Sequence, residues 1–174
     1  MRKKIKLFDP VIGISEERET VKILRSGYWA SGAGSGKVLQ FENKFREYLG
    51  SDQCIAVNSG TAALNLSLSL LNIKNKEVIL PSLSFVSTAH AVTLNGGIPV
   101  FVDVDAKTCC IDPKQIRKAI SKKTAVILPV HFAGMACNMD EILDICEESN
   151  VQLVEDAAHA SGAKYNHKKI GSHG

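Results

Sequence analysis

Residues 77–105 read EVILPSLSFVSTAHAVTLNGGIPVFVDVD, and this stretch decides the fold. Its two apolar runs, 78–80 and 98–102, are rich in Val and Ile and predict buried strands. Between them, residues 86–94 predict a helix that ends at the Gly-Gly pair 96–97. A strand, a helix and a second strand in this order predict parallel strands with helices packed on both faces of the sheet.

The same alternation continues on both sides of this stretch and predicts an α/β fold with a mainly parallel sheet between helices. Ser15, Asp112 and Asn138 are the predicted helix N-caps, because the residues after each favour the first turn of a helix. The other predicted elements are strands at 54–57, 125–128 and 151–154, helices at 15–25, 38–49, 62–71 and after the last two N-caps, and a hairpin around Asn166–His167.

The composition excludes several classes of protein. Of the 174 residues 45% are apolar, too many for a disordered chain, and no apolar run reaches the ~18 residues of a membrane span. The net charge of +3 is spread along the chain, which argues against a nucleic-acid partner. The five cysteines include no C-x-x-C pair, so neither a zinc site nor a disulfide framework is predicted. Residues 1–17 lack the apolar core of a secretory signal, and we expect a cytoplasmic protein that binds no membrane.

The first candidate site is the turn NSGTAAL, residues 58–64, which follows a predicted strand and opens a helix. Free N–H groups and the helix dipole favour an anion such as phosphate at this position. Gly60 allows a close approach, and Ser59 or Thr61 adds a hydroxyl donor. An ordinary capped turn between a strand and a helix also explains the motif, and for this motif alone it is the preferred interpretation.

The second candidate site is EDAAHA, residues 155–160, directly after the predicted strand 151–154. Open α/β sheets bind their ligands at the carboxyl ends of strands. A buried Asp156 requires a cationic or donor partner, for which a protonated pyridine nitrogen would serve, or else it caps the following turn. His159 lies three residues on and reaches the same site if one helical turn intervenes.

Three further features have weaker interpretations. Phe85 follows the strand 78–80 and either lies against a planar ligand or belongs to the core. His131 also follows a strand, and a structural role is favoured for it. The glycine-rich loop 31–36 does not fit the dinucleotide fingerprint and lacks a preceding strand, so a surface loop is predicted there.

Five motifs follow one another along nearly the whole chain: NSGTAAL, LPSLSFVSTAHAV, GGIPVFVDVD, PVHFAG and VEDAAHASGAKYNHKKIGSHG. Together they resemble the DegT/DnrJ/EryC1/StrS family of sugar aminotransferases, which use pyridoxal 5′-phosphate (PLP). The resemblance implies the aspartate-aminotransferase-like fold (type I), with an N-terminal arm and helices at 1–50 and the large PLP-binding domain at 51–174. It also implies amino transfer from glutamate to a keto group of a nucleotide-linked sugar, in surface-polysaccharide, glycan or antibiotic biosynthesis, by a homodimer.

The resemblance assigns roles to individual residues. Gly60, Thr61 and Ala62, with Ser59 beside them, match the turn that holds the cofactor phosphate. Phe85 matches the aromatic side chain stacked on the pyridine ring. Asp156 matches the acid that pairs with the ring nitrogen, and His159 takes the place next to the ring hydroxyl. Asp156 and His159 are therefore the candidate catalytic residues.

The resemblance places the Schiff-base lysine and the C-terminal small domain beyond Gly174. Lys164, Lys168 and Lys169 follow Asp156, but they fall in the predicted hairpin and not in the sequence context of that lysine. We therefore expect an N-terminal part of an aminotransferase that is inactive alone. The alternatives are a lysine-independent sugar dehydratase of the same family and a non-catalytic α/β module that binds a phosphorylated ligand or a partner.

Overall fold

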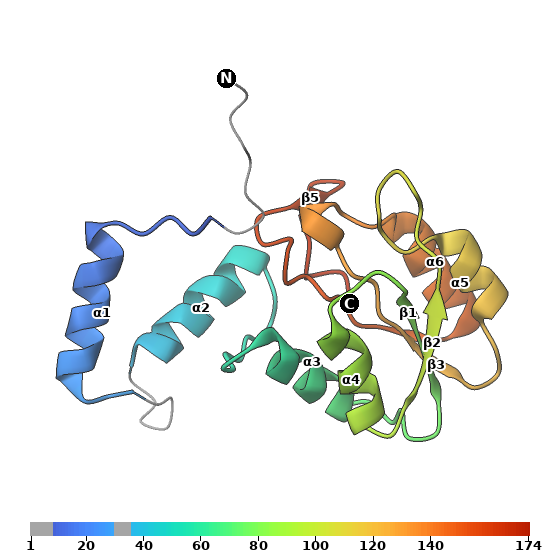
Figure 1. Cartoon of the computed structure of the whole chain (residues 1–174), viewed down its shortest axis with the longest axis horizontal. Coiled ribbons are helices and arrows are strands. Elements are labelled where there is room, and N and C mark those ends of the chain that lie inside the picture. The colour runs from blue at the N-terminus through green and yellow to red at the C-terminus, as the bar shows by residue number, and fades with distance from the viewer. Residues whose placement is uncertain (1–8, 30–35) are drawn as a thin grey trace. The chain divides into compact units, whose positions relative to one another are not determined.

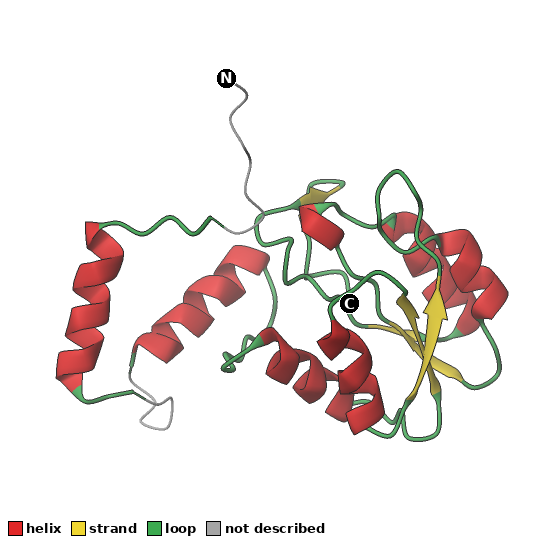
Figure 2. Ribbon diagram, viewed as in Figure 1, coloured by secondary structure: helices red, strands yellow, loops and turns green. Residues whose placement is uncertain are grey.

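The computed structural model describes residues 9–29 and 36–174. The chain divides into two compact units, Met1–Phe45 and Arg46–Gly174, and all strands of the described residues belong to the second (Figure 1, Figure 2). Within these residues, no helix combines the length and apolar composition that a membrane crossing requires. Of the predicted glycine-rich loop, residues 31–35 lie outside the described residues.

Two helices precede the sheet, α1 (Ile14–Ser26) and α2 (Lys37–Leu49), and α2 continues into the second unit. The predicted N-cap Ser15 is wrong, because α1 begins one residue earlier and has Gly13 as its N-cap. The Glu16 carboxylate accepts the Gly13 N–H at 2.7 Å and the Ser15 hydroxyl at 2.9 Å. The carboxylate thus binds the N-cap N–H, and the Ser15 hydroxyl donates to the same carboxylate instead of capping the helix.

The second unit contains a four-stranded parallel sheet in the order β2-β1-β3-β4. In the central pairs, Ile79 lies opposite Val100 on one side and Ile127 on the other. The strands are β1 (Glu77–Pro81), β2 (Ile98–Val102), β3 (Thr124–Ile127) and β4 (Gln152–Leu153), and an antiparallel hairpin joins β5 (Lys164–Tyr165) to β6 (Lys168–Lys169). The helices are α3 (Gly60–Ser69), α4 (Val86–Leu94), α5 (Pro113–Ala119), the short 3-10 turn η2 (Phe132–Gly134) and α6 (Met139–Ser149).

Helices cover both faces of this sheet, as its apolar strands require (Figure 1). Successive side chains of β1 alternate between the faces: Val78 and Leu80 pack with α3 and α4, and Ile79 packs with α5 and α6. The buried helical partners are Leu68, Ala91 and Val92 on the first face and Ile116, Ile142 and Ile145 on the second. The predicted mainly parallel α/β arrangement is confirmed.

Two predicted strands differ from the structure. Residues 54–57 form no strand, and Ile55 is 72% exposed, so this apolar run is not the buried strand that its composition predicts. The predicted strand 151–154 is reduced to the two residues of β4. By contrast, β2 has the predicted bounds, and the hairpin turns at Asn166 and His167, both with positive φ.

The two N-caps predicted in the second unit have different outcomes. Asp112 caps α5 as predicted, since its carboxylate accepts the Lys114 N–H at 2.9 Å. Asn138 is at the N-cap position of α6, as predicted, but its side chain accepts no N–H of that helix. Its amide instead donates to Glu141, and its oxygen accepts the Tyr165 hydroxyl at 3.1 Å, so the side chain connects α6 to the hairpin.

Gly97 lies where the chain enters β2, and the packing there leaves no room for a side chain. A Cβ atom at this position would lie 2.9 Å from Val92 Cγ1 and 3.1 Å from Ile73 Cδ1, both in the core. We expect Gly97→Ala to lower the free energy of unfolding by about 1–3 kcal/mol. Denaturant titration measures the change, and Gly60→Ala is the control in the same unit, because no atom of the described residues lies within 4 Å of its Cβ position. Equal midpoints for the two variants would contradict the expectation.

Candidate active site

A cavity of about 220 Å³ lies at the carboxyl ends of the sheet strands. The starts of α3 and α4 and the segment after β4 contribute its polar side, and Leu64, Val130 and Phe132 contribute apolar surface. Five predicted site residues line it: Gly60, Thr61, Phe85, Asp156 and His159. Ser59 and Ala62 are adjacent in sequence but do not line the cavity.

The turn at the start of α3 is both a capped turn and an opening for an anion. Ser59 is the N-cap, and its hydroxyl oxygen accepts the Ala62 N–H at 3.2 Å. A helix leaves its first N–H groups without intrahelical acceptors, so those of Gly60 and Thr61 have none within α3. Nothing lies within 4 Å of the Cβ position of Gly60, which leaves space for a ligand against the backbone. The Ala62 N–H, in contrast, is already bound by Ser59.

Asp156 places a buried carboxylate in the cavity. The residue is 8% exposed, and its Oδ2 accepts the Thr88 hydroxyl at 3.0 Å while Oδ1 accepts the Ala158 N–H at 3.3 Å. No Lys, Arg or His within residues 9–29 and 36–174 forms an ion pair with it. A buried carboxylate stabilised only by neutral donors favours a cationic ligand.

His159 has a defined tautomer. Its Nδ1 accepts the Ala133 N–H at 3.3 Å, so in the neutral ring the proton is on Nε2, which is then a hydrogen-bond donor. The turn that supplies this N–H is unusual, because Ala133 has φ +51° and Gly134 has φ +86°. The Phe132 ring packs edge-on against the imidazole, with 5.9 Å between the ring centroids. These contacts fix the orientation of the His159 ring.

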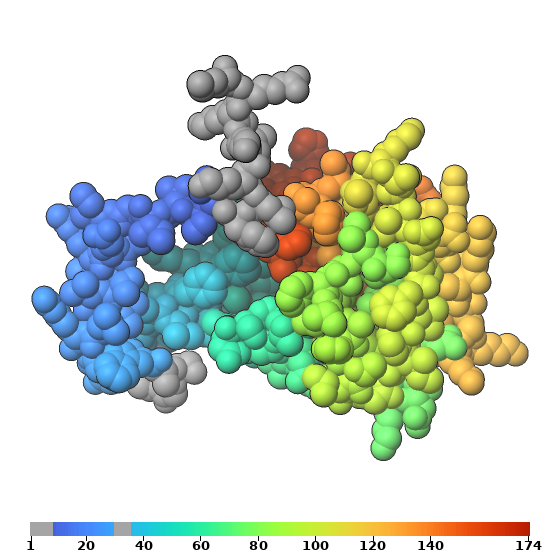
Figure 3. All heavy atoms as spheres, in the orientation of Figure 1, coloured from blue at the N-terminus to red at the C-terminus, as the bar shows by residue number. Residues whose placement is uncertain are grey.

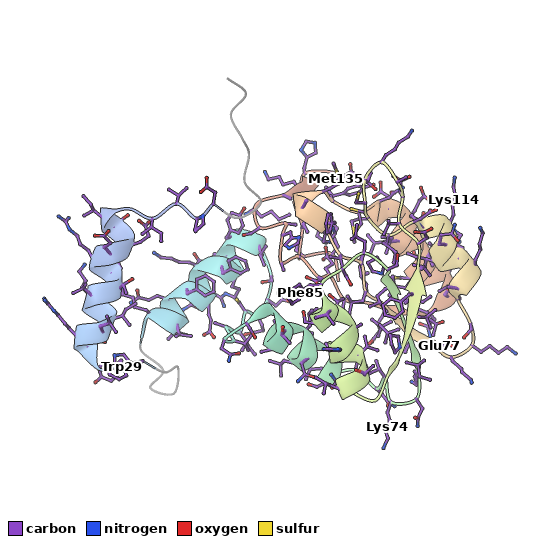
Figure 4. All side chains as sticks on the ribbon, viewed as in Figure 1. Trp29, Lys74, Glu77, Phe85, Lys114 and Met135 are labelled. Atoms are coloured by element: carbon purple, nitrogen blue, oxygen red, sulfur yellow. The ribbon has the colours of Figure 1, made fainter. Side chains whose placement is uncertain are left out.

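Phe85 is at the N-cap position of α4 and projects from the start of that helix (Figure 4). It is 71% exposed and lines the cavity, so the alternative that it is a core residue is wrong. An exposed aromatic face beside a cavity can stack on a planar ligand.

His131 agrees with the interpretation drawn from the sequence, whereas the role of Thr88 was not predicted. His131 is fully buried and does not line the cavity, in agreement with the favoured structural interpretation. Sequence reasoning missed Thr88, which holds the Asp156 carboxylate. The sequence does not single out Thr88, because Ser87, His90 and Thr93 of the same helix are polar as well; only the structure shows that Thr88 is 0% exposed. A buried hydroxyl requires a partner.

Comparison with known proteins gives a consistent result. A model of the DegT/DnrJ/EryC1/StrS aminotransferase family matches residues 11–174. The spore coat polysaccharide biosynthesis protein SpsC of Bacillus subtilis is 41% identical over 95% of this chain and 42% of its own length. GDP-perosamine synthase of Caulobacter vibrioides is 40% identical over 91% of this chain and 43% of its own length. The chain therefore spans less than half of these relatives.

Solved structures give the same fold. The crystal structure of 3-amino-5-hydroxybenzoic acid synthase superposes on 93% of this chain with a TM-score of 0.88 and 37% sequence identity. The match covers 42% of the synthase chain. The PLP form of the sugar aminotransferase Spr1654 from Streptococcus pneumoniae matches 98% of this chain with 47% of its own, at TM-score 0.88 and 31% identity. The structure of a GDP-4-keto-6-deoxymannose-3-dehydratase matches 97% of this chain with a TM-score of 0.88 and 28% sequence identity, and the match covers 45% of the dehydratase chain. The predicted type I fold is confirmed.

Proposed function

Because the chain belongs to the DegT/DnrJ/EryC1/StrS aminotransferase family, we propose that residues 51–174 are the PLP-binding domain of a sugar aminotransferase. The observation that carries the proposal is Asp156, a buried carboxylate that lines the cavity without a cationic partner among the described residues. A protonated pyridine nitrogen would supply the missing positive charge. Similar solved structures, among them one in a PLP form and one with bound pyridoxamine phosphate, support the same cofactor.

The cavity residues fit the separate parts of PLP. The Gly60 and Thr61 N–H groups, at the positive end of the α3 dipole, would bind the phosphate. The Phe85 ring would lie against the pyridine ring, and the Asp156 carboxylate would hold a proton at the ring nitrogen. The Nε2–H of His159 would donate to the ring hydroxyl oxygen. When bound, PLP supplies a conjugated ring that takes up electron density from the reacting carbon of the substrate.

For the whole reaction, we propose amino transfer from glutamate to a keto group of a nucleotide-linked sugar. The names of SpsC and GDP-perosamine synthase support a role in polysaccharide or amino-sugar synthesis. The proposed oligomeric state is a homodimer. Large apolar side chains are exposed on α4 and on the edge strand β2, the green to yellow-green surface in Figure 3, and include Val86 and Phe101. Exposed apolar surface of this kind favours contact with a second chain.

A second candidate function is a sugar dehydratase that uses the same cofactor without a catalytic lysine. The likeness to the GDP-4-keto-6-deoxymannose-3-dehydratase favours it. Both candidates require the cofactor contacts of Asp156 and His159. They differ in product, since only the aminotransferase makes an amino sugar from glutamate.

The cofactor proposal is tested by binding pyridoxamine 5′-phosphate, which forms no covalent bond with lysines. We expect it to bind at least about tenfold more tightly than pyridoxamine, because the α3 N-terminus stabilises the phosphate. Isothermal titration of the chain with both compounds, and with inorganic phosphate, measures the difference. Binding of inorganic phosphate as tight as that of pyridoxamine 5′-phosphate would instead support the non-catalytic module. Glutamate-dependent formation of an amino sugar, assayed with residues 1–174 joined to the remaining part of SpsC, then tests whether these residues support amino transfer.

A further inference from the structure

Glu155 directly precedes Asp156, but its carboxylate lies on the opposite side of the strand end. Neighbouring side chains of an extended segment point to opposite faces, so Asp156 lines the cavity while Glu155 lies beneath it. The Glu155 side chain is 4% exposed. No Lys or Arg of the described chain forms an ion pair with it.

The Glu155 carboxylate binds the segment 171–174 through backbone groups. Its Oε1 accepts the N–H of His173 at 2.7 Å and that of Gly174 at 3.2 Å, and its Oε2 accepts the N–H of Gly171 at 3.1 Å. The His173 ring nitrogen Nδ1 lies 3.5 Å from Oε2. The segment passes close to β4, since a Cβ at Gly174 would lie 3.0 Å from the Leu153 carbonyl oxygen.

The same carboxylate binds His131, and His131 binds Asp156. The Nδ1 of His131 accepts the Cys137 N–H at 3.1 Å, so Nε2 carries the proton and donates it to Glu155 Oε2 at 3.0 Å. The backbone N–H of His131 donates to the Asp156 carbonyl at 3.1 Å. His131 thus joins the two acids through separate groups.

We infer that Glu155 is a positioning residue: by holding His131 and the segment 171–174, it fixes the strand end from which Asp156 faces the cavity. The functional meaning of this role rests on the proposed binding of PLP by Asp156. The hydrogen bonds themselves do not depend on the cofactor.

The protonation state of Glu155 agrees with this role. Burial alone would raise its pKa, but the hydrogen bonds from His131 and from the His173 and Gly171 N–H groups lower the pKa to about 2. The carboxylate is therefore ionised near neutral pH and accepts from every neighbour. In a glutamine at this position, one carboxylate oxygen is replaced by an NH2 group that faces one of these donors. Neither the NH2 group nor the donor that it faces then has an acceptor.

Amide hydrogen exchange of the cofactor-free chain tests the inference. In Glu155→Gln, exchange at Gly171, His173, His131 and Asp156 should accelerate at least about tenfold more than at Leu128, an amide bound within the sheet. Glu155→Asp keeps the charge and should show a smaller increase; it also serves if the glutamine variant does not fold. The control is Glu148→Gln, an exposed acid paired with Arg117, which should leave all five amides unchanged.

A uniform acceleration that includes Leu128 to the same degree would overturn the inference, because it would show only a general loss of stability. Unchanged exchange at Asp156 and His131 would overturn it as well. Since no cofactor is present, these results are independent of whether the chain binds pyridoxamine 5′-phosphate. That binding, measured afterwards in Glu155→Gln, should weaken if the strand end has moved.

Discussion

Replacing Asp156 by asparagine should weaken the binding of pyridoxamine 5′-phosphate by about 10- to 100-fold, the usual effect of losing a buried charge-assisted hydrogen bond. Asparagine has nearly the same size, and its oxygen can still accept the Thr88 hydroxyl, which lies 3.0 Å from the carboxylate in the parent. The variant loses the negative charge and one of the two acceptor oxygens, the one that accepts the Ala158 N–H in the parent. The side-chain amide would donate to an unprotonated ring nitrogen, so the bound ring should lose its proton.

Titration calorimetry measures the affinity, and the absorption spectrum of the bound compound reports the protonation of its ring. The matched control is Asp144→Asn, an exposed acid on α6 on the opposite side of the sheet from α3 and α4. The control should bind like the parent. An affinity of Asp156→Asn within about twofold of the parent would show that Asp156 only caps the turn at Ala158.

The position of the site could be predicted because it depends on local order in the sequence. Asp156 follows an apolar run, Gly60 opens a helix and Phe85 follows a strand, and in a parallel sheet such segments meet at one edge. The contacts among them could not be predicted. Thr88 lies 68 residues from Asp156 in the chain, and only the packing of α4 against the sheet brings the two together.

The difference between local sequence pattern and contacts formed in the folded chain also explains where the predicted fold is wrong. The run 98–102 is apolar throughout and has a neighbouring strand, so pattern and structure agree at β2. The run 54–57 has the same pattern, but it belongs to neither of the two sheets formed by the described residues, and the apolar pattern alone does not distinguish the two cases. At Gly13 the error has a local cause: glycine also serves as an N-cap, and the Glu16 carboxylate accepts both the Gly13 N–H and the Ser15 hydroxyl.

Neighbouring core residues of β1 lie on opposite faces of the sheet, so we expect their replacement to have different consequences. Leu80 and Ile79 are both 0% exposed in the central strand β1. Each replacement by alanine should lower the free energy of unfolding by about 2–5 kcal/mol, since a buried side chain is lost and a cavity remains. Ile98→Ala, at a site that is 47% exposed on the edge strand, is the control and should cost less than about 1 kcal/mol.

Only one of the two core variants should also affect the site. Leu80 belongs to the buried cluster that contains Leu64 and Val130, and both of these line the cavity. Ile79 packs instead with α5 and α6 on the other face. We therefore expect Leu80→Ala to weaken pyridoxamine 5′-phosphate binding at a temperature where it remains folded, whereas Ile79→Ala should bind like the parent. Equal affinities for the two variants would show that the packing beneath the cavity does not shape it, and that the polar groups of α3, α4 and the segment after β4 suffice to hold the ligand.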